Sequence, residues 1–305
     1  TAYRRQRQMC IRDSIVPISF FSDIELLTNK FASDKNIELK MLIGLFNRVT
    51  QYKIHIVTLD RDTSLDKIVE TFERLNKTGM PLSTFDLATA RLYKYGIKLR
   101  DLLEEAKKSY EFANVVQPEN ILKVISLMKG KDPRRKNILQ LDPENFEEYW
   151  RRACVALNDA YTRIVDIKNG YGVINFKKWV PYSPIIVTLA GLIDYLKGHS
   201  MEDPNTYAKL DTFYWTSVFS NHYEQSVDSV IYSDYKEMIV WFNQNKVPKF
   251  IKEFDINDVD LEVSSAAAAI FKGVISLIVL KGALDFQTGQ PPQFELNKNK
   301  IQVDH

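Results

Sequence analysis

The sequence predicts a mainly α-helical protein, in which a small, truncated α/β portion is followed by a large helical domain. Three observations support this fold class. From residue 98 onward apolar residues recur at helical spacing almost throughout, only short segments alternate as strands do, and Gly and Pro number just 11 each. So few Gly and Pro residues argue against a collagen-like, linker-rich or many-turned all-β protein.

Composition narrows the class further. The 305 residues are 45% hydrophobic and 12% aromatic, which is enough for a sizeable core and excludes wholesale disorder. At roughly 150 residues per domain, the length predicts about two domains. The two cysteines, Cys10 and Cys154, are too few for a disulfide framework, which favours a reducing cytosol. In the most apolar stretch, 266–284, only eight uncharged residues separate Lys272 from Lys281, so we expect no membrane span.

The first fourteen residues, TAYRRQRQMCIRDS, have no apolar periodicity. Residues 9–14 resemble the translation of a transposon-end sequencing adapter, so we expect residues 1–14 to be an artefact rather than a genuine basic tail. The chain holds 41 Lys and Arg against 39 Asp and Glu, and this segment contains four Arg and one Asp. The remaining 37 basic and 38 acidic residues give a net charge of −1, which excludes an argument for nucleic-acid binding from global basicity.

The N-terminal part shows both kinds of periodicity. Residues 23–30 and 38–50 have helical spacing, whereas 52–59 (YKIHIVTL) alternates and is rich in β-branched side chains, which predicts a strand. An amphipathic helix is expected over 65–75. Ser83 and Asp86, three residues apart, predict a capping box that begins a helix ending near Gly96.

The remainder is helical in pattern, with Pro and Gly between the segments. A polar, Gly- and Pro-bearing linker is expected over 285–293, and 294–305 turns strand-like again. The expected helices cover 99–112, 120–128, 145–166, 185–196, 205–219, 229–243 and 264–280.

The most distinctive string is FERLNKTGMPLS, residues 72–83. It describes a helix end, a tight polar loop and a second, capped helix. Backbone N–H groups at the start of that second helix could bind an anion such as phosphate. From the residues alone, a helical joint without a ligand is the favoured interpretation.

This string, behind YKIHIVTL, closely resembles the N-terminal domain of GmrSD-type restriction endonucleases. The strings PYSPIIVTLAGL (181–192) and FYWTSVFSNHYEQSVDS (213–229) look like the helical region of the same family, and the resemblance spans nearly all of 15–305. The family more often has Arg where this chain has His222 before Tyr223, so a role for that Arg is not carried over. The matching residues of the first string are Phe72, Glu73, Arg74, Leu75, Asn76, Gly79, Pro81, Leu82, Ser83, Asp86 and Leu87.

The resemblance implies a domain order. Residues 15–97 would be the C-terminal part of a ParB/sulfiredoxin-like domain, 98–284 a helical domain, and 285–305 a linker with the first strand of a truncated HNH nuclease domain. The family's Asp-Gly-Gln-Gln-Arg motif, used in nucleotide handling, is absent here and would precede residue 15. The candidates for the nucleotide pocket are Glu73, Arg74, Asn76 and Gly79, although Glu73 and Arg74 equally suit a solvated or paired helix surface.

The ending KIQVDH resembles the start of the HNH metal-binding motif. On this interpretation Asp304 is a ligand of Mg²⁺ or another divalent metal, and His305 is the general base. By themselves, two residues at a chain end more often form a frayed tail. The other Asn and His of the motif are missing, so we expect this fragment to be inactive.

The remaining candidates are weaker. We expect His55 to lie on the strand face opposite the core, His199 at the surface, and Cys154 in the packing of a helix. The basic loop 131–136 (KDPRRK) could contact phosphates, but a solvated turn is the favoured interpretation.

The sequence is therefore interpreted as a fragment of a GmrSD-like, modification-dependent restriction or phage-defence endonuclease. The resemblance implies a bacterial or archaeal cytoplasmic enzyme that uses a nucleoside triphosphate and cleaves modified foreign DNA, with no membrane partner and with homo-oligomerisation left open. Two alternatives remain: a non-nuclease, ParB-like helical DNA-binding or scaffold protein, and a nucleotide hydrolase without nuclease activity.

Overall fold

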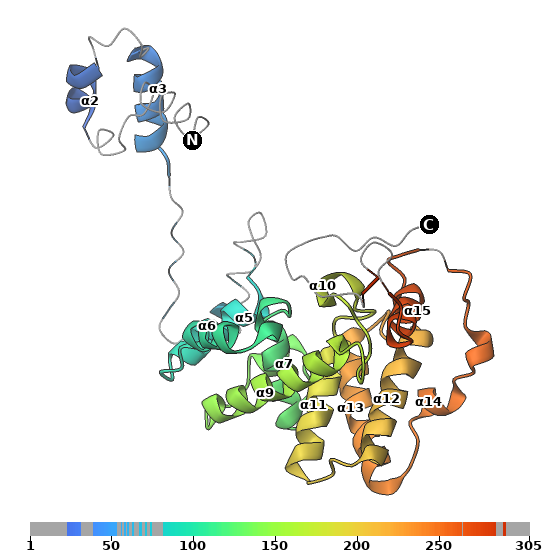
Figure 1. Cartoon of the computed structure of the whole chain (residues 1–305). Coiled ribbons are helices and arrows are strands. Elements are labelled where there is room, and N and C mark those ends of the chain that lie inside the picture. Colours follow the sequence, from blue (N-terminus) through green and yellow to red (C-terminus); the bar gives the residue numbers. More distant parts are fainter. Residues whose placement is uncertain are drawn as a thin grey trace. The chain divides into compact units, whose positions relative to one another are not determined.

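The computed structural model describes residues 23–31, 39–53, 82–263, 265–284 and 289–290, together with 56, 58, 60, 63, 67, 68, 71 and 74 (Figure 1). The chain divides into two compact units, Thr1–Ile68 and Val69–His305. The predicted artefact (1–14) and the predicted nuclease strand (294–305) lie outside the described residues. What is described is mainly helical, as the sequence predicts.

In the first unit, two helices pack against each other: α2 (Ile24–Phe31) and α3 (Leu39–Thr50). Both were expected from apolar spacing. The Asp23 carboxylate begins α2 by accepting a hydrogen bond from the backbone N–H of Glu25 at 2.8 Å.

The strand expected over 52–59 is not seen: the described residues of this range, Tyr52, Lys53, Ile56 and Thr58, belong to no strand. The side chains of Tyr52 and Ile56 are 75% and 84% exposed. An alternating pattern supplies only a preference, because a strand also needs a neighbour to pair its backbone groups. No strand occurs anywhere among the described residues, so the small α/β portion is not found in them.

The capping box expected at residue 83 is confirmed. It begins α5 (Thr84–Tyr93): the backbone N–H of Asp86 donates to Ser83 Oγ at 3.1 Å, and the backbone N–H of Ser83 donates to Asp86 Oδ2 at 3.3 Å. The helix buries Phe85, Ala88 and Leu92 in the main core. It packs against α6 (Leu99–Ser109), α7 (Glu119–Met128) and α8 (Arg135–Ile138). The domain boundary at 97 and 98 stays a prediction, but α5 packs with helices of the predicted helical domain.

One buried helix organises the second unit. In α11 (Ile185–Gly198), each of the residues 185–193 is buried, and α7 (Glu119–Met128), α9 (Phe146–Val165) and α13 (Val227–Gln244) pack around it (Figure 1). A helix that is apolar on every side must be enclosed in this way. At Gly191 the approach is close, because a Cβ there would lie 3.1 Å from both Leu127 and Tyr235 side-chain atoms.

Most expected helices are found within two residues of their predicted ends. An exception is α15, which begins at Ala269 rather than at 264; residues 265–267 are exposed, and a turn that buries no apolar surface gains little from becoming helical. Five short helices of three to five residues were not expected as separate elements. The other helical elements are α6 (Leu99–Ser109), η3 (Glu111–Asn114), α8 (Arg135–Ile138), α10 (Phe176–Trp179), α12 (Pro204–Phe219), α14 (Lys249–Glu253) and η4 (Ile256–Asp258).

None of the helices in the described part of the chain combines the length and the apolar character needed to cross a membrane.

Candidate functional site

The residues predicted for nucleotide and metal binding fall almost entirely outside the described part. Glu73, Asn76, Gly79, Asp304 and His305 are not described. Arg74 is described; it lies in a helical turn with its side chain exposed. The nucleotide and nuclease assignments therefore stay predictions.

At the predicted anion-binding helix start, two backbone donors are already used. The N–H groups of Ser83 and Asp86 are bound within the capping box, and the Asp86 carboxylate lies at the helix N-terminus where an anion would bind. The hydrogen bond from Ser83 lowers the pKa of Asp86, and Arg100, 3.2 Å from its Oδ1, lowers it further. A phosphate would compete with this carboxylate, which favours the helical joint without a ligand.

Residues of the two family-like strings 181–192 and 213–229 contact each other between the start of α11 and the loop that joins α12 to α13. The Tyr182 hydroxyl donates to Asn221 Oδ1 at 3.1 Å, and the hydroxyls of Thr188 and Tyr223 lie 2.8 Å apart. The rings of Tyr182 and Tyr223 are 6.1 Å apart between centroids. Two strings separated by about 20 residues thus form one hydrogen-bonded cluster.

At the edge of this cluster lies a buried His–Asp pair. Nε2 of His222 is 2.9 Å from Oδ1 of Asp234, whose side chain is only 3% exposed, whereas that of His222 is 23% exposed. The imidazole also stacks on the Phe250 ring at 3.9 Å between centroids, with 7° between the planes. An ionised Asp only accepts hydrogen bonds, so Nε2–H of His222 donates to Oδ1 when Asp234 is ionised.

Burial has the largest effect on the pKa of Asp234. Desolvation raises its pKa above the ordinary value of 3.8, and the hydrogen bond and charge of His222 oppose this rise. The Tyr223 hydroxyl, itself completely buried, acts in the same direction as His222. Such an Asp orients the imidazole, as in proton-transfer sites.

His222 lines a pocket of about 460 Å³, which we call the carboxylate pocket. Among the described residues that line it there is no Lys or Arg, so this lining repels phosphates and suits a cationic group held by carboxylates and aromatic rings. Its residues are Phe219, Ser220, Asn221, His222, Phe250, Glu253, Phe254, Asp255, Asp258, Val259, Asp260 and Ile270.

One feature of the sequence indicates that Asp234 needs a partner. Along α13 the buried positions Ile231, Asp234, Tyr235 and Met238 follow helical spacing, so Asp234 is a charged residue on an otherwise apolar face. A charge in that position is rarely tolerated without a partner. Its partner, His222, could not be identified from spacing.

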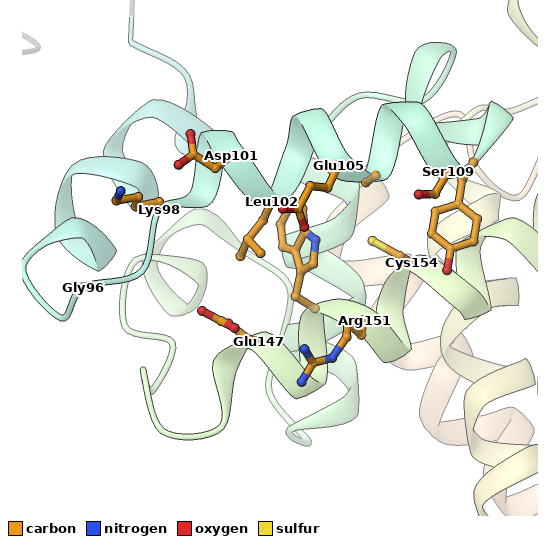
Figure 2. Close-up of a pocket in the computed structure, with 12 residues that line it drawn as sticks. Gly96, Lys98, Asp101, Leu102, Glu105, Ser109, Glu147, Arg151 and Cys154 are labelled. Atoms are coloured by element: carbon orange, nitrogen blue, oxygen red, sulfur yellow. The ribbon is translucent and has the colours of Figure 1, made fainter.

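A second pocket, of about 430 Å³, lies between α6 and α9 (Figure 2). Its rim carries Lys98, Asp101, Glu105 and Arg151, while the Cys154 sulfur points from α9 toward α6 (Figure 2). Burial raises the pKa of Cys154 to about 12, so the thiol is not a nucleophile near neutral pH. Cys154 is buried in helix packing, as expected.

The basic loop 131–136 forms an ion pair and hydrogen bonds with other residues of the protein. Arg134 Nε lies 3.1 Å from Asp132 Oδ2, and its Nη2 donates to Ser229 Oγ at 3.1 Å. Ser126 Oγ donates to the Asp132 carbonyl at 3.1 Å.

His199, expected at the surface, is exposed and stacks on Tyr195.

No family model matches the chain, and no solved structure matches it. Uncharacterized protein MJ0686 of Methanocaldococcus jannaschii is 33% identical over 263 residues, which cover 80% of this chain and 44% of that protein. The chain thus spans less than half the length of the curated relative that it matches.

Proposed function

We propose that this chain is part of a GmrSD-like, modification-dependent restriction or phage-defence endonuclease. The intact protein would use a nucleoside triphosphate and cleave modified foreign DNA at a metal-dependent HNH site, in the cytoplasm of a bacterium or archaeon. The support is the resemblance of three strings to this family. The chain covers 44% of its archaeal relative, so DNA cleavage and nucleotide use are proposed for the whole protein and not for this chain by itself.

One structural observation carries most of the support. The strings PYSPIIVTLAGL and FYWTSVFSNHYEQSVDS each resemble the family separately. In the structure, Tyr182 and Thr188 of the first string contact Asn221 and Tyr223 of the second. Strings that matched the family by chance would have no reason to form hydrogen bonds with each other, one of them buried. The contact therefore favours a common helical region, in which these residues position one another.

The chemistry is assigned to residues outside or at the margin of the described part. In the proposal Glu73, Arg74, Asn76 and Gly79 contribute to the nucleotide pocket, while His305 takes the proton from the attacking water. A divalent ion at Asp304 would supply charge stabilisation at the scissile phosphate. Among the described residues no group of three or more His, Cys, Asp or Glu side chains could hold a metal, so Asp304 would need ligands beyond them.

The direct test uses the gene and its whole product. Sequencing beyond both ends of the coding segment should reveal an Asp-Gly-Gln-Gln-Arg string upstream and an Ile-Phe-Pro continuation with Asn and His downstream. A stop codon immediately after His305 would rule out the nuclease assignment.

The second test separates the two proposed activities. In the whole product, His305→Ala should abolish Mg²⁺-dependent cleavage of modified DNA and leave nucleotide hydrolysis unchanged. Exposed His199 provides the matched control, because His199→Ala should affect neither activity. Unchanged cleavage by His305→Ala would refute the general-base role, and hydrolysis without cleavage in the wild type would favour the nucleotide hydrolase.

A further inference from the structure

Two surfaces of opposite charge flank the short helix α14. One is a hollow of about 780 Å³, which we call the lysine hollow. Its floor is aliphatic and its rim carries four Lys and two Glu side chains. The lining residues are Lys236, Glu237, Val240, Lys246, Val247, Pro248, Lys249, Lys252 and Glu253.

The positive charge of the lysine hollow is poorly neutralised. Lys249 Nζ is 3.8 Å from Glu253 Oε1 in a pair whose side chains are 82% and 64% exposed. Lys236 lies over the Tyr232 ring, 5.3 Å from its centroid. Lys246 and Lys252 have no ion pair with any residue that the structure describes. These two ammonium groups can therefore pair with an incoming anion without breaking an existing bond.

The other surface is the acidic segment, residues 255–262 (DINDVDLE). It has four carboxylates and no basic residue. Its apolar side chains are unusually open to solvent, because Ile256 is 62% and Leu261 is 69% exposed. A segment with this composition offers negative charge that complements the Lys side chains of the lysine hollow, and apolar side chains that can pack against its Val and Pro residues.

We propose that two copies of this chain associate through these surfaces, with the lysine hollow of each copy binding the acidic segment of the other. Charge complementarity identifies the occupant. The two surfaces adjoin, since Glu253 lines both the lysine hollow and the carboxylate pocket. A two-fold pair therefore uses both surfaces of both copies and closes.

The lining argues for a protein occupant rather than a nucleic acid. No aromatic ring lines the lysine hollow, so it offers nothing on which a base could stack, and Glu237 and Glu253 on its rim repel phosphates. Val240, Val247 and Pro248 instead provide an apolar floor for side chains such as Ile256 and Leu261. Within one copy, Asp255, Asp258 and Asp260 line the carboxylate pocket instead.

Sedimentation velocity of the full chain tests the proposal. The wild type should form a dimer whose dissociation constant rises at least about tenfold between about 50 and 500 mM NaCl. Lys246→Glu/Lys252→Glu gives both surfaces a net negative charge and should weaken the dimer about a hundredfold. Asp258→Lys/Asp260→Lys/Glu262→Lys gives both surfaces a net positive charge and should weaken it to the same extent.

Mixing the lysine-hollow variant with the acidic-segment variant is the decisive experiment. In a mixed pair both contacts regain opposite charges, so a heterodimer within a few-fold of the wild-type affinity is expected. Lys108→Glu/Lys177→Glu changes the net charge as much as Lys246→Glu/Lys252→Glu does, on exposed side chains elsewhere, and should dimerise like the wild type. Circular dichroism and thermal melting establish that every variant is folded.

Three outcomes would overturn the proposal: a wild type that is monomeric at both salt concentrations, charge-reversed variants that dimerise like the wild type, or a mixture of the two variants that stays monomeric. A monomeric wild type whose binding to a DNA duplex is lost in Lys246→Glu/Lys252→Glu would reassign the lysine hollow to nucleic acid. None of these results depends on nuclease or nucleotide activity, so this proposal and the proposed function fail independently.

Discussion

Nε2 of His222 lies 2.9 Å from Oδ1 of Asp234, and this contact connects the loop after α12 to the buried face of α13. The stacking of the same imidazole on Phe250 adds α14 to the connection. Because Asp234 is almost fully buried, the protein depends on His222 to compensate the carboxylate. The pair therefore positions α14, whose two sides carry the carboxylate pocket and the lysine hollow.

Removing the imidazole should destabilise the fold. His222→Ala leaves Asp234 buried without its charged donor, and we expect a loss of about 1–3 kcal/mol, less than for a fully buried pair because His222 is partly exposed. Urea denaturation followed by circular dichroism measures the loss. His199→Ala should change the free energy of unfolding by no more than about 0.5 kcal/mol. Equal effects of the two substitutions would show that the pair has no special role.

The pH dependence of stability should carry the signature of Asp234. Its pKa is raised in the folded state, so just above the ordinary value of 3.8 the folded protein keeps a proton that the unfolded chain has lost. The free energy of unfolding contributed by this group therefore falls as pH rises through the raised pKa. The free energy of unfolding of the wild type minus that of Asp234→Asn should therefore be largest at the acid end of that window. A urea series between about pH 4 and 7 tests the sign, and the opposite slope would contradict the raised pKa.

Ser83→Ala should weaken the start of α5. The substitution removes the oxygen that accepts the Asp86 backbone N–H, and the loss of such a cap costs about 1 kcal/mol. Hydrogen exchange measured by mass spectrometry on peptides covering 84–93 should show correspondingly faster opening. Ser109→Ala, at the exposed end of α6, should leave the exchange of α5 unchanged. Unchanged exchange in Ser83→Ala would mean that packing alone holds the helix.

Gly172 and Gly130 form a matched pair, because their φ angles are +70° and +69°. A Cβ at Gly172 would lie 2.5 Å from the Ser276 carbonyl oxygen and 2.8 Å from Leu280 Cγ, whereas at Gly130 nothing lies within 4 Å. Gly130→Ala should therefore cost only the left-handed backbone conformation, about 1 kcal/mol, and Gly172→Ala about 3 kcal/mol or more. Urea denaturation compares the two. Equal losses would show that α15 can move away from the Gly172 loop without penalty.

Some features of this protein follow from neighbours in the sequence. The capping box of Ser83 and Asp86 is a local hydrogen-bonding unit, and it begins the helix at the predicted position. The run 185–193 is too apolar to face solvent, and it became the central helix α11. Helix bounds were predictable for the same reason, because helical hydrogen bonds join residues four apart.

Other features depended on partners that are distant in the sequence. The strand expected over 52–59 was not seen in its described residues, since alternation sets a preference but supplies no pairing partner. The packing of α5 against α6, α7 and α8 likewise cannot be deduced from its capping box.

The sequence by itself determined where most helices begin and end, and that much of their surface must be buried. Only the tertiary structure decided that His222 meets Asp234 and that a carboxylate pocket and a lysine hollow share Glu253. The physical reason is the range of the interactions: caps and apolar periodicity act within a few residues, whereas burial of a charge and the shape of a pocket depend on how separate helices pack.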